Sequence, residues 1–193
     1  MRAVALFTTA VTISCPIDIA KQLISCVNDN GFDNISGILN CLGSIKPDPV
    51  LRAYITGGLD TVVVCTVDSS TGELGACQDA GGNGFSFPFG IAIDTKGQRA
   101  FIANFFNNTV SVCTIDQTTG KFNACKTAGN GFNGPTAIVL VNNQNNPSMT
   151  FAYIIQDNTL SISKCTIGTD GTLSDCQTTP TFPFRQTGIV FND

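Results

Sequence analysis

Short apolar segments alternate with polar ones along almost the whole chain, and within them every second residue tends to be apolar or β-branched. The alternation is clearest at residues 61–67 (TVVVCTV) and 109–115 (TVSVCTI). Gly, Asn and Asp interrupt it after roughly every eight to twelve residues, which is the spacing of strands joined by tight turns. No segment shows a convincing helical period longer than a few turns. The pattern therefore predicts an all-β protein.

The same order of elements recurs four times. Residues 52–77 (RAYITGGLDTVVVCTVDSSTGELGAC) are matched by residues 99–125 (RAFIANFFNNTVSVCTIDQTTGKFNAC). Each unit has three strands, a loop rich in Gly, Phe and Pro, and a fourth short apolar strand. Four strands in a repeat of about 40–50 residues are typical of a β-propeller blade. A β-sandwich is the alternative, but a sandwich does not require sequence repetition. We expect one propeller domain over 1–193, with units 2–51, 52–98, 99–150 and 151–193.

The two ends of the chain fit a closed ring. The sequence begins with the second strand of a blade and ends, at 187–193 (TGIVFND), with the first strand of one. We predict that residues 187–192 pair with 3–8, so that one blade of a four-bladed propeller is built from both termini. Two chains closing an eight-bladed ring are the alternative to a monomer. Residues 1–15 match the repeat, and we interpret them as structure and not as a signal peptide.

Eight of the nine cysteines form four pairs, each on two consecutive strands of one hairpin. The spacing changes with the length of the hairpin loop, and the shortest loop contains Asp170-Gly171, which predicts a two-residue turn. We expect four disulfides in an oxidising compartment; reduced thiols in the cytosol are the alternative. Cys41 is left over and is expected to be a buried free thiol. The expected pairs are Cys15/Cys26, Cys65/Cys77, Cys113/Cys125 and Cys165/Cys176.

Several segments carry a family resemblance. AYIT and AFIAN, NNTVSVCTID, TGKFNAC and GNGF followed by Pro resemble the YVTN-type β-propeller repeats of bacterial surface and secreted proteins, in their cysteine-bearing version. The resemblance covers nearly the whole chain and is strongest over 52–136. It implies a propeller fold and a secreted, periplasmic or cell-surface location. Related propellers include lactonase-like enzymes, but the match involves structural positions only and carries over no catalytic residue. The first unit lacks the loop Pro, and four units are few for this family.

Composition excludes several functions. Only 12% of the residues are charged, against about 25% in a typical domain. A net charge of −4 argues against nucleic acid as a partner, because phosphate binding needs clustered Lys and Arg. No apolar run approaches the ~18 residues of a membrane-spanning helix. The chain has no His, which removes His catalysis and, without a CxxC motif, a zinc site. We expect no cofactor, no metal ion and no catalytic residue.

Phe and Asn collect in the loops that a propeller places on one face. An exposed set of this kind would bind a protein or cell-surface ligand; the alternative for each Phe is that it fills the seam between two blades. Phe105 and Phe106 are consecutive, so both are not easily buried, and one of them is the preferred contact residue. The candidate binding residues are Asn83, Phe85, Phe87, Phe89, Asn104, Phe105, Phe106, Asn107, Phe132, Phe184 and Arg185.

These observations favour a non-enzymatic binding scaffold. The alternative is a lactonase-like or other metal-assisted hydrolase, with a cation held in the central channel. Asp94 follows a predicted innermost strand, and Asn142 and Asn192 stand at near-equivalent positions; a ring of such oxygens would suit a hard cation. Asp68 and Asp116 follow the cysteine-bearing strands and are expected to form turns.

Overall fold

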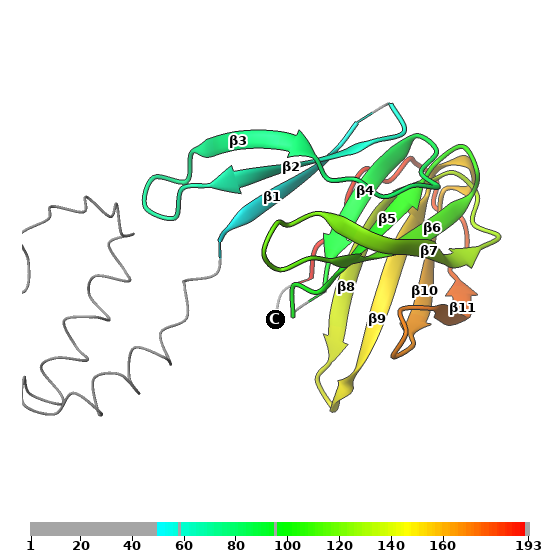
Figure 1. The fold of residues 1–193 in the computed structure, drawn as a ribbon. Helices are drawn as coiled ribbons and strands as arrows, with labels where there is room; N and C mark the ends of the chain where they lie inside the picture. The colour runs from blue at the N-terminus through cyan, green and yellow to red at the C-terminus, as the bar shows by residue number, and fades with distance from the viewer. Residues whose placement is uncertain (1–49, 58, 95, 192–193) are drawn as a thin grey trace, which may run out of the picture. The chain divides into compact units, whose positions relative to one another are not determined.

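The computed structural model describes residues 50–57, 59–94 and 96–191, and Leu51–Asp193 form one compact unit. The predictions for Cys15, Cys26, Cys41 and the strand at 3–8 lie outside the described residues. The described part consists of antiparallel strands and one short 3-10 helix, η1 Asp157–Thr159 (Figure 1). The strands are β1 Arg52–Thr56, β2 Val62–Val67, β3 Leu74–Asp79, β4 Pro88–Ile93, β5 Arg99–Asn104, β6 Thr109–Ile115, β7 Phe122–Asn130, β8 Pro135–Asn143, β9 Asn146–Gln156, β10 Ser161–Ile167 and β11 Leu173–Thr178.

The strands form three sheets in which sequence neighbours pair. Sheet A contains β1-β2-β3 among the described residues, sheet B contains β4-β5-β6-β7, and sheet C contains β8-β9-β10-β11. The fourth apolar strand of a repeat pairs with the next repeat, because β4 pairs with β5. The predicted strand order is therefore confirmed for sheets B and C, which have the four-stranded meander of propeller blades. The number of blades and the closure of a ring stay predictions.

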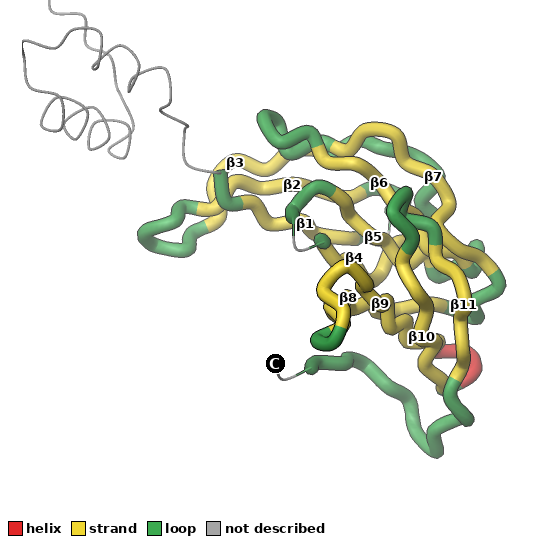
Figure 2. The backbone as a smooth tube through the Cα atoms, turned by 90° about the horizontal axis from the view of Figure 1, so that it is seen from below, coloured by secondary structure: helices red, strands yellow, loops and turns green. Residues whose placement is uncertain are grey.

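The predicted last strand is not formed. After β11 the chain continues as a loop towards the C-terminus (Figure 2), and residues 187–191 have no strand assignment. A strand needs a neighbour that receives its backbone hydrogen bonds, and the expected neighbour at 3–8 lies outside the described residues. The prediction for 187–192 is therefore wrong for the part of it that the structure describes.

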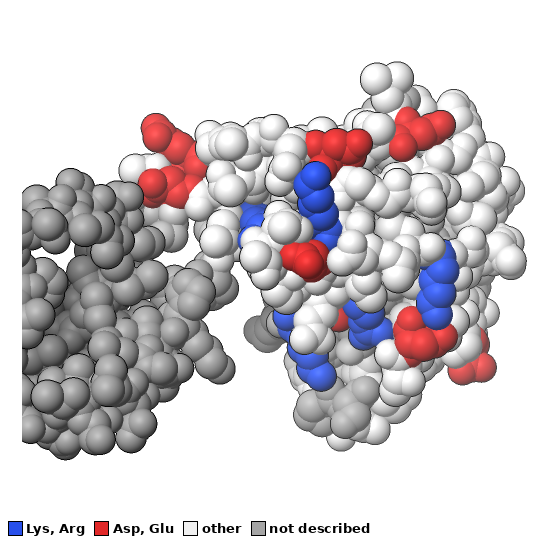
Figure 3. Space-filling view, viewed as in Figure 1, with Lys and Arg blue, Asp and Glu red and all other residues white. Residues whose placement is uncertain are grey.

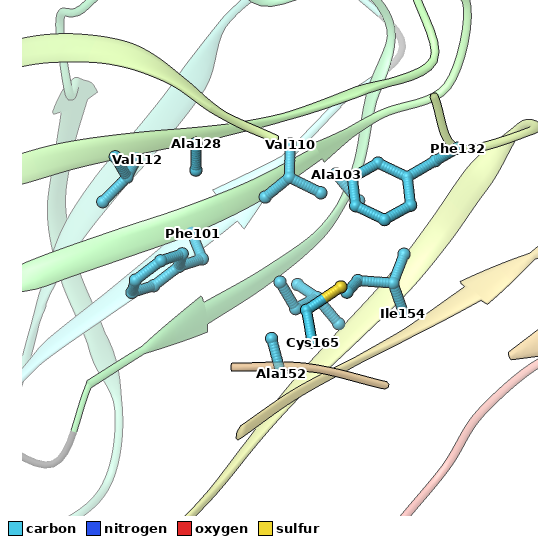
Figure 4. Close-up of a cluster of buried hydrophobic side chains, with 10 residues drawn as sticks. Phe101, Ala103, Val110, Val112, Ala128, Phe132, Ala152, Ile154 and Cys165 are labelled. Atoms are coloured by element: carbon cyan, nitrogen blue, oxygen red, sulfur yellow. The ribbon is translucent and has the colours of Figure 1, made fainter. Parts of the chain in front are cut away.

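Sheet B is buried on both faces. Towards sheet A, Ala100 and Ile102 of β5 pack with Val62 and Val64 of β2. Successive side chains of a strand point to opposite faces, so Phe101 faces sheet C, in a cluster with Ala152 and Ile154 of β9 (Figure 4). The alternation seen in the sequence thus serves two seams, one on each side of sheet B.

The innermost strands of sheets B and C lie very close together. A Cβ atom on Gly90 of β4 would stand 2.7 Å from the Cα atom of Ala137 in β8 and from the carbonyl oxygen of Thr136. Only a residue without a side chain allows this approach. Gly90 therefore fixes the distance between the two strands.

In each of the three sheets, one disulfide joins the two outer strands. The bonds Cys65–Cys77, Cys113–Cys125 and Cys165–Cys176 are present, each with Cα atoms 4.0 Å apart. In every sheet the strand register shifts next to the cysteines, which is a β-bulge. The pairing predicted for these six cysteines is confirmed, and the bulge supplies the local adjustment that brings opposed residues within bonding distance.

The hairpin loop between β10 and β11 differs in length from the prediction. In sheet C, the N–H of Gly168 donates to the carbonyl of Thr172 and the N–H of Gly171 donates to that of Gly168. The loop therefore spans the three residues 169–171, with Gly171 at φ 85°, and the predicted two-residue turn is wrong. A type I turn followed by a left-handed glycine is a common three-residue hairpin, because glycine pays no steric penalty there.

Arginine side chains tie sheet A to a hairpin loop of sheet B, and sheet B to a hairpin loop of sheet C. Arg52 opens β1, and its Nη2 donates to the carbonyl of Thr118 in sheet B at 2.7 Å. Arg99 opens β5, and its Nη1 donates to the carbonyls of Gly168 and Thr169 in sheet C at 3.4 and 3.1 Å. The Arg-Ala-aromatic-Ile opening shared by two repeats is thus explained by a contact across the seam.

Candidate binding surface

The turns of the three sheets gather at two ends that differ in chemistry. We call one the aromatic end: it contains the turns at 59–61, 105–108 and 157–160 and the connections leading into β4 and β8. We call the other the charged end: it contains the turns at 68–73, 96–98, 116–121 and 168–172. On the face seen in Figure 3, the charged side chains of the described residues are few and separated by wide uncharged areas.

Four phenylalanines form a contiguous cluster at the aromatic end. The ring of Phe87 lies 5.2 Å from Phe89, 6.4 Å from Phe105 and 4.6 Å from Phe106, measured between centroids. Phe105 lies 5.5 Å from both Phe89 and Phe106. These separations are in the range of favourable ring–ring contacts. The rings therefore support one another and present one joint surface.

The cluster is strongly exposed. Phe106 is 65% exposed and Phe89 is 48% exposed, whereas Phe87 and Phe105 are half-buried. Of the consecutive pair, Phe106 is thus the exposed member. The ring of Phe105 turns towards sheet C, since its Cε2 would stand 3.0 Å from a Cβ atom on Gly134. Phe106 and Phe89 form the accessible part of the surface.

The matching turn in sheet C has the same backbone and no aromatic residue. Pro88 pairs with Asn104 as Pro135 pairs with Gln156, so Phe106 and Asn158 occupy equivalent positions. Their N–H groups make equivalent hydrogen bonds, each of 3.3 Å. By the same register, the positions of Phe87, Phe89 and Phe105 hold in sheet C the residues Gly134, Thr136 and Asp157. The fold is therefore built without rings at these four positions.

Backbone conformation supports the same conclusion at Phe87. Phe87 has φ 53°, in the left-handed region, and its equivalent Gly134 has φ 62°. A residue with a Cβ atom pays roughly 1–2 kcal/mol to adopt this conformation. Both residues precede a proline. The chain thus keeps a phenylalanine at a position where the geometry favours glycine.

Asn104, a predicted binding residue, is instead a buried structural amide. Its Nδ2 donates to Ser111 Oγ at 2.8 Å, and its Oδ1 accepts the N–H of Ser86 at 3.4 Å. Gln156 makes the same kinds of bond at the equivalent position in sheet C. In sheets B and C the amide therefore fastens the connection before the first strand to the third strand, and it is not available to a partner.

The other predicted residues separate into two groups. Phe85 and Phe132 are buried, one in each seam, because they fill equivalent gaps between the sheets; they are not part of an exposed surface. Asn83 and Asn107 are exposed. Phe184 is 65% exposed, and Arg185 forms an ion pair with Asp157, which raises the pKa of the guanidinium.

Two further residues at the aromatic end escaped the sequence analysis. Leu59 is 80% exposed in the turn after β1. Asp60 is also exposed, and its Oδ1 accepts the N–H of Phe87 at 2.8 Å. The repeat alignment could have indicated both residues, because it places them in the turn of sheet A that is equivalent to the turn of Phe106 in sheet B.

The charged end uses its polar groups internally. Asp94 accepts hydrogen bonds from the N–H of Gln98 and from Arg99 Nε, at 2.8 and 2.9 Å. Hydrogen bonds from the Ser70 hydroxyl and then from backbone N–H groups lower the pKa of Asp68 to about 2. Asp116 has a lowered pKa for the same reason, with Thr119 as the main donor. Both residues form turns, as predicted.

The expected cation ring is not supported by these contacts. A cleft of about 440 Å³ does lie beside Asp94, Lys96 and Arg99, but the Asp94 carboxylate is occupied by its own turn and by Arg99. Asn142 accepts a hydrogen bond from Thr150, and Asn192 lies outside the described residues. Within residues 50–57, 59–94 and 96–191, no three His, Cys, Asp or Glu side chains gather around a metal position.

No protein-family model matches the sequence, and neither does any curated protein. Three solved structures show partial likeness. An auxiliary nutrient binding protein from Bacteroides ovatus is 14% identical, with a TM-score of 0.47, over 64% of this chain and 32% of its own. A putative 6-phosphogluconolactonase from Bacteroides fragilis is 18% identical, with a TM-score of 0.49, over 70% of this chain and 38% of its own. The periplasmic gluconolactonase from Pseudomonas aeruginosa is 13% identical, with a TM-score of 0.46, over 70% of this chain and 41% of its own. This chain thus spans well under half the length of each.

The disulfides bear on location. Such bonds form and persist outside the reducing cytosol, so the three present here support an extracytoplasmic location. Within the described part of the chain, no helix has the length and apolar character required to cross a bilayer.

Proposed function

We propose that this protein is a binding protein that recognises a macromolecular partner through the aromatic end, in an oxidising compartment, on a ring of four blades. The observation that carries the proposal is the cluster of Phe87, Phe89, Phe105 and Phe106. Two of its rings are about half-exposed or more, and sheet C builds the same backbone without any of them. An exposed aromatic patch that the fold does not need is a feature of interaction surfaces.

An exposed cluster of neighbouring aromatic rings suits a macromolecule better than a small molecule. Small ligands bind in concave sites that cover most of their surface, and the cleft described above lies at the charged end. Phe rings contribute binding energy when a partner removes them from water. The partner is therefore expected to cover Phe106 and Phe89 together.

The test replaces the exposed rings by the residues of sheet C. Phe106→Asn and Phe89→Thr keep the local backbone, since Asn158 and Thr136 occupy the equivalent positions. The tagged protein captures partners from an extract of the extracytoplasmic fraction, which are quantified by mass spectrometry. We expect the double variant to lose the captured partner while its thermal unfolding stays unchanged.

Leu74→Ser is the matched control, because Leu74 is also an exposed apolar residue but lies in β3, away from the cluster. Equal capture by the wild type and a folded double variant would disprove the proposal. Loss of capture in Leu74→Ser as well would show that the partner recognises exposed apolar surface in general, and that also contradicts it.

A further inference from the structure

Asp60 places a carboxylate directly beside the aromatic cluster. Its Oδ1 accepts the N–H of Phe87 at 2.8 Å, and the Phe87 ring in turn lies 4.6 Å from that of Phe106. Asp60 is exposed, and among the described residues it forms no ion pair. The aromatic surface is therefore bordered by an uncompensated negative charge.

The fold does not need this charge. In sheet B the equivalent turn residue is Asn108, and its Oδ1 accepts the N–H of Gly134, also at 2.8 Å. Gly134 is the equivalent of Phe87. The same hydrogen bond is thus made once by a carboxylate and once by a neutral amide, so the charge of Asp60 is available for another purpose.

No cation among the described residues of the aromatic end balances the charge. Arg185 is paired with Asp157, while Arg52 and Arg99 contact loops of the charged end. Asp79, at the end of β3, adds a second exposed carboxylate, whose oxygen accepts the N–H of Gly81. The surface thus combines exposed phenyl rings with negative charge.

We infer that the partner segment recognised at the aromatic end is an apolar and basic polypeptide. Its apolar side chains cover Phe89 and Phe106, and a Lys or Arg faces Asp60. Ring faces also attract cations, and the net charge of −4 on the whole chain favours the approach of a basic segment. This inference rests on the proposed function and specifies the partner's chemistry.

Two other occupants fit the charge less well. A second copy of this chain that docked through the same surface would bring another Asp60 and, from the described residues of its aromatic end, no unpaired cation. An anionic lipid surface would be repelled by the same carboxylates. Both occupants are therefore treated as outcomes of the test.

The experiment measures peptide binding by fluorescence anisotropy. The probes are two labelled twelve-residue peptides, one of alternating Leu and Lys and one with Gln in place of every Lys. We expect the wild type to prefer the Lys peptide, and Asp60→Asn to reduce that preference about two- to five-fold, the scale of an exposed ion pair. Asp60→Asn keeps the acceptor for Phe87, as Asn108 does for Gly134, so its thermal unfolding should match the wild type.

The controls separate the two proposals. If Phe106→Asn abolishes binding of both peptides while Asp60→Asn leaves the Lys preference intact, the basic-partner inference fails and the proposed function stands. If a folded Phe106→Asn binds both peptides like the wild type, the proposed function fails too. Self-association of the wild type in sedimentation, absent in Phe106→Asn, would assign the surface to a second copy. Binding to phosphatidylserine vesicles in place of the Lys peptide would assign it to lipid; either result overturns the inference.

Discussion

The contacts that join neighbouring sheets differ between the charged end and the aromatic end. At the charged end, long side chains make the contact, as when Arg99 reaches two carbonyl groups of sheet C. At the aromatic end, backbone groups and short amide side chains make the contact, as when the Oδ1 of Asn108 accepts a hydrogen bond from the N–H of Gly134. The aromatic end therefore holds the sheets together without Phe89 and Phe106, and those two rings are left exposed.

The comparison separates repeated from unrepeated residues. Phe85 and Phe132 each end an Asn-Gly-Phe segment, which the sequence contains three times, and both are buried in the two seams. Phe89 and Phe106 have no aromatic counterpart in sheet C and are exposed. A residue that recurs between repeats serves the fold, whereas a residue that appears once is available for recognition.

The largest effect should come from a repeated ring. Phe132→Ala is expected to reduce the free energy of unfolding by about 3–5 kcal/mol, because it removes a buried ring and leaves a cavity. Phe106→Asn should change it by less than about 0.5 kcal/mol, as expected for an exposed residue. Denaturant unfolding of both variants measures the difference. Similar losses in the two would contradict the division into repeated and unrepeated residues.

The next effect concerns the charged end. Arg99→Ala should lower the free energy of unfolding by about 1–2 kcal/mol, since it removes the ion pair with Asp94 and the hydrogen bonds to sheet C. Lys121→Ala is the control at the same end, because Lys121 is exposed and crosses no seam, and it should stay within about 0.5 kcal/mol. If Arg99→Ala is as mild as Lys121→Ala, the side chains do not hold this end together.

A smaller effect tests the left-handed backbone at Phe87. Phe87→Gly should be more stable than Phe87→Ala by about 0.5–1 kcal/mol, because glycine alone tolerates a positive φ without strain. Elsewhere in a strand or loop the order is normally reversed, since glycine loses more entropy on folding. Denaturant unfolding of the pair decides it. A more stable alanine variant would mean that the conformation at 87 differs from that at Gly134.

The smallest effect is the pH dependence of the turn at Asp68. The folded pKa of about 2 lies below the ordinary value of 3.8, so the unfolded state binds a proton first as the pH falls. The stabilisation by this carboxylate is therefore complete above about pH 4–5 and disappears as the pH drops through 2. We expect the wild type to exceed Asp68→Asn in melting temperature slightly at pH 7, and the gap to close near pH 2. A gap that is constant over this range would rule out the carboxylate as its cause.

Much of the fold could be predicted because the repeat supplies several copies of each element. The pairing of Cys113 with Cys125 follows from a spacing that recurs with the loop, and the position of β4 follows from its likeness to β8. Which of Phe105 and Phe106 is exposed could not be predicted, since the side a turn residue faces depends on contacts across the seam, such as that of Phe105 with Gly134. The burial of Asn104 could not be predicted either, because its hydrogen-bond partners lie outside its own strand.

The position of the disulfides has a consequence for recovery after damage outside the cell. Each of the three described bonds joins the two outer strands of one sheet, and none of them crosses a seam. If the sheets separate, each outer hairpin stays covalently held in its native register, and a slip by one residue, which would turn every side chain to the wrong face, is prevented. Reassembly then requires that the inner strands pair again and that the sheets pack against one another. A protein that works far from chaperones thus keeps a template of each sheet within the chain.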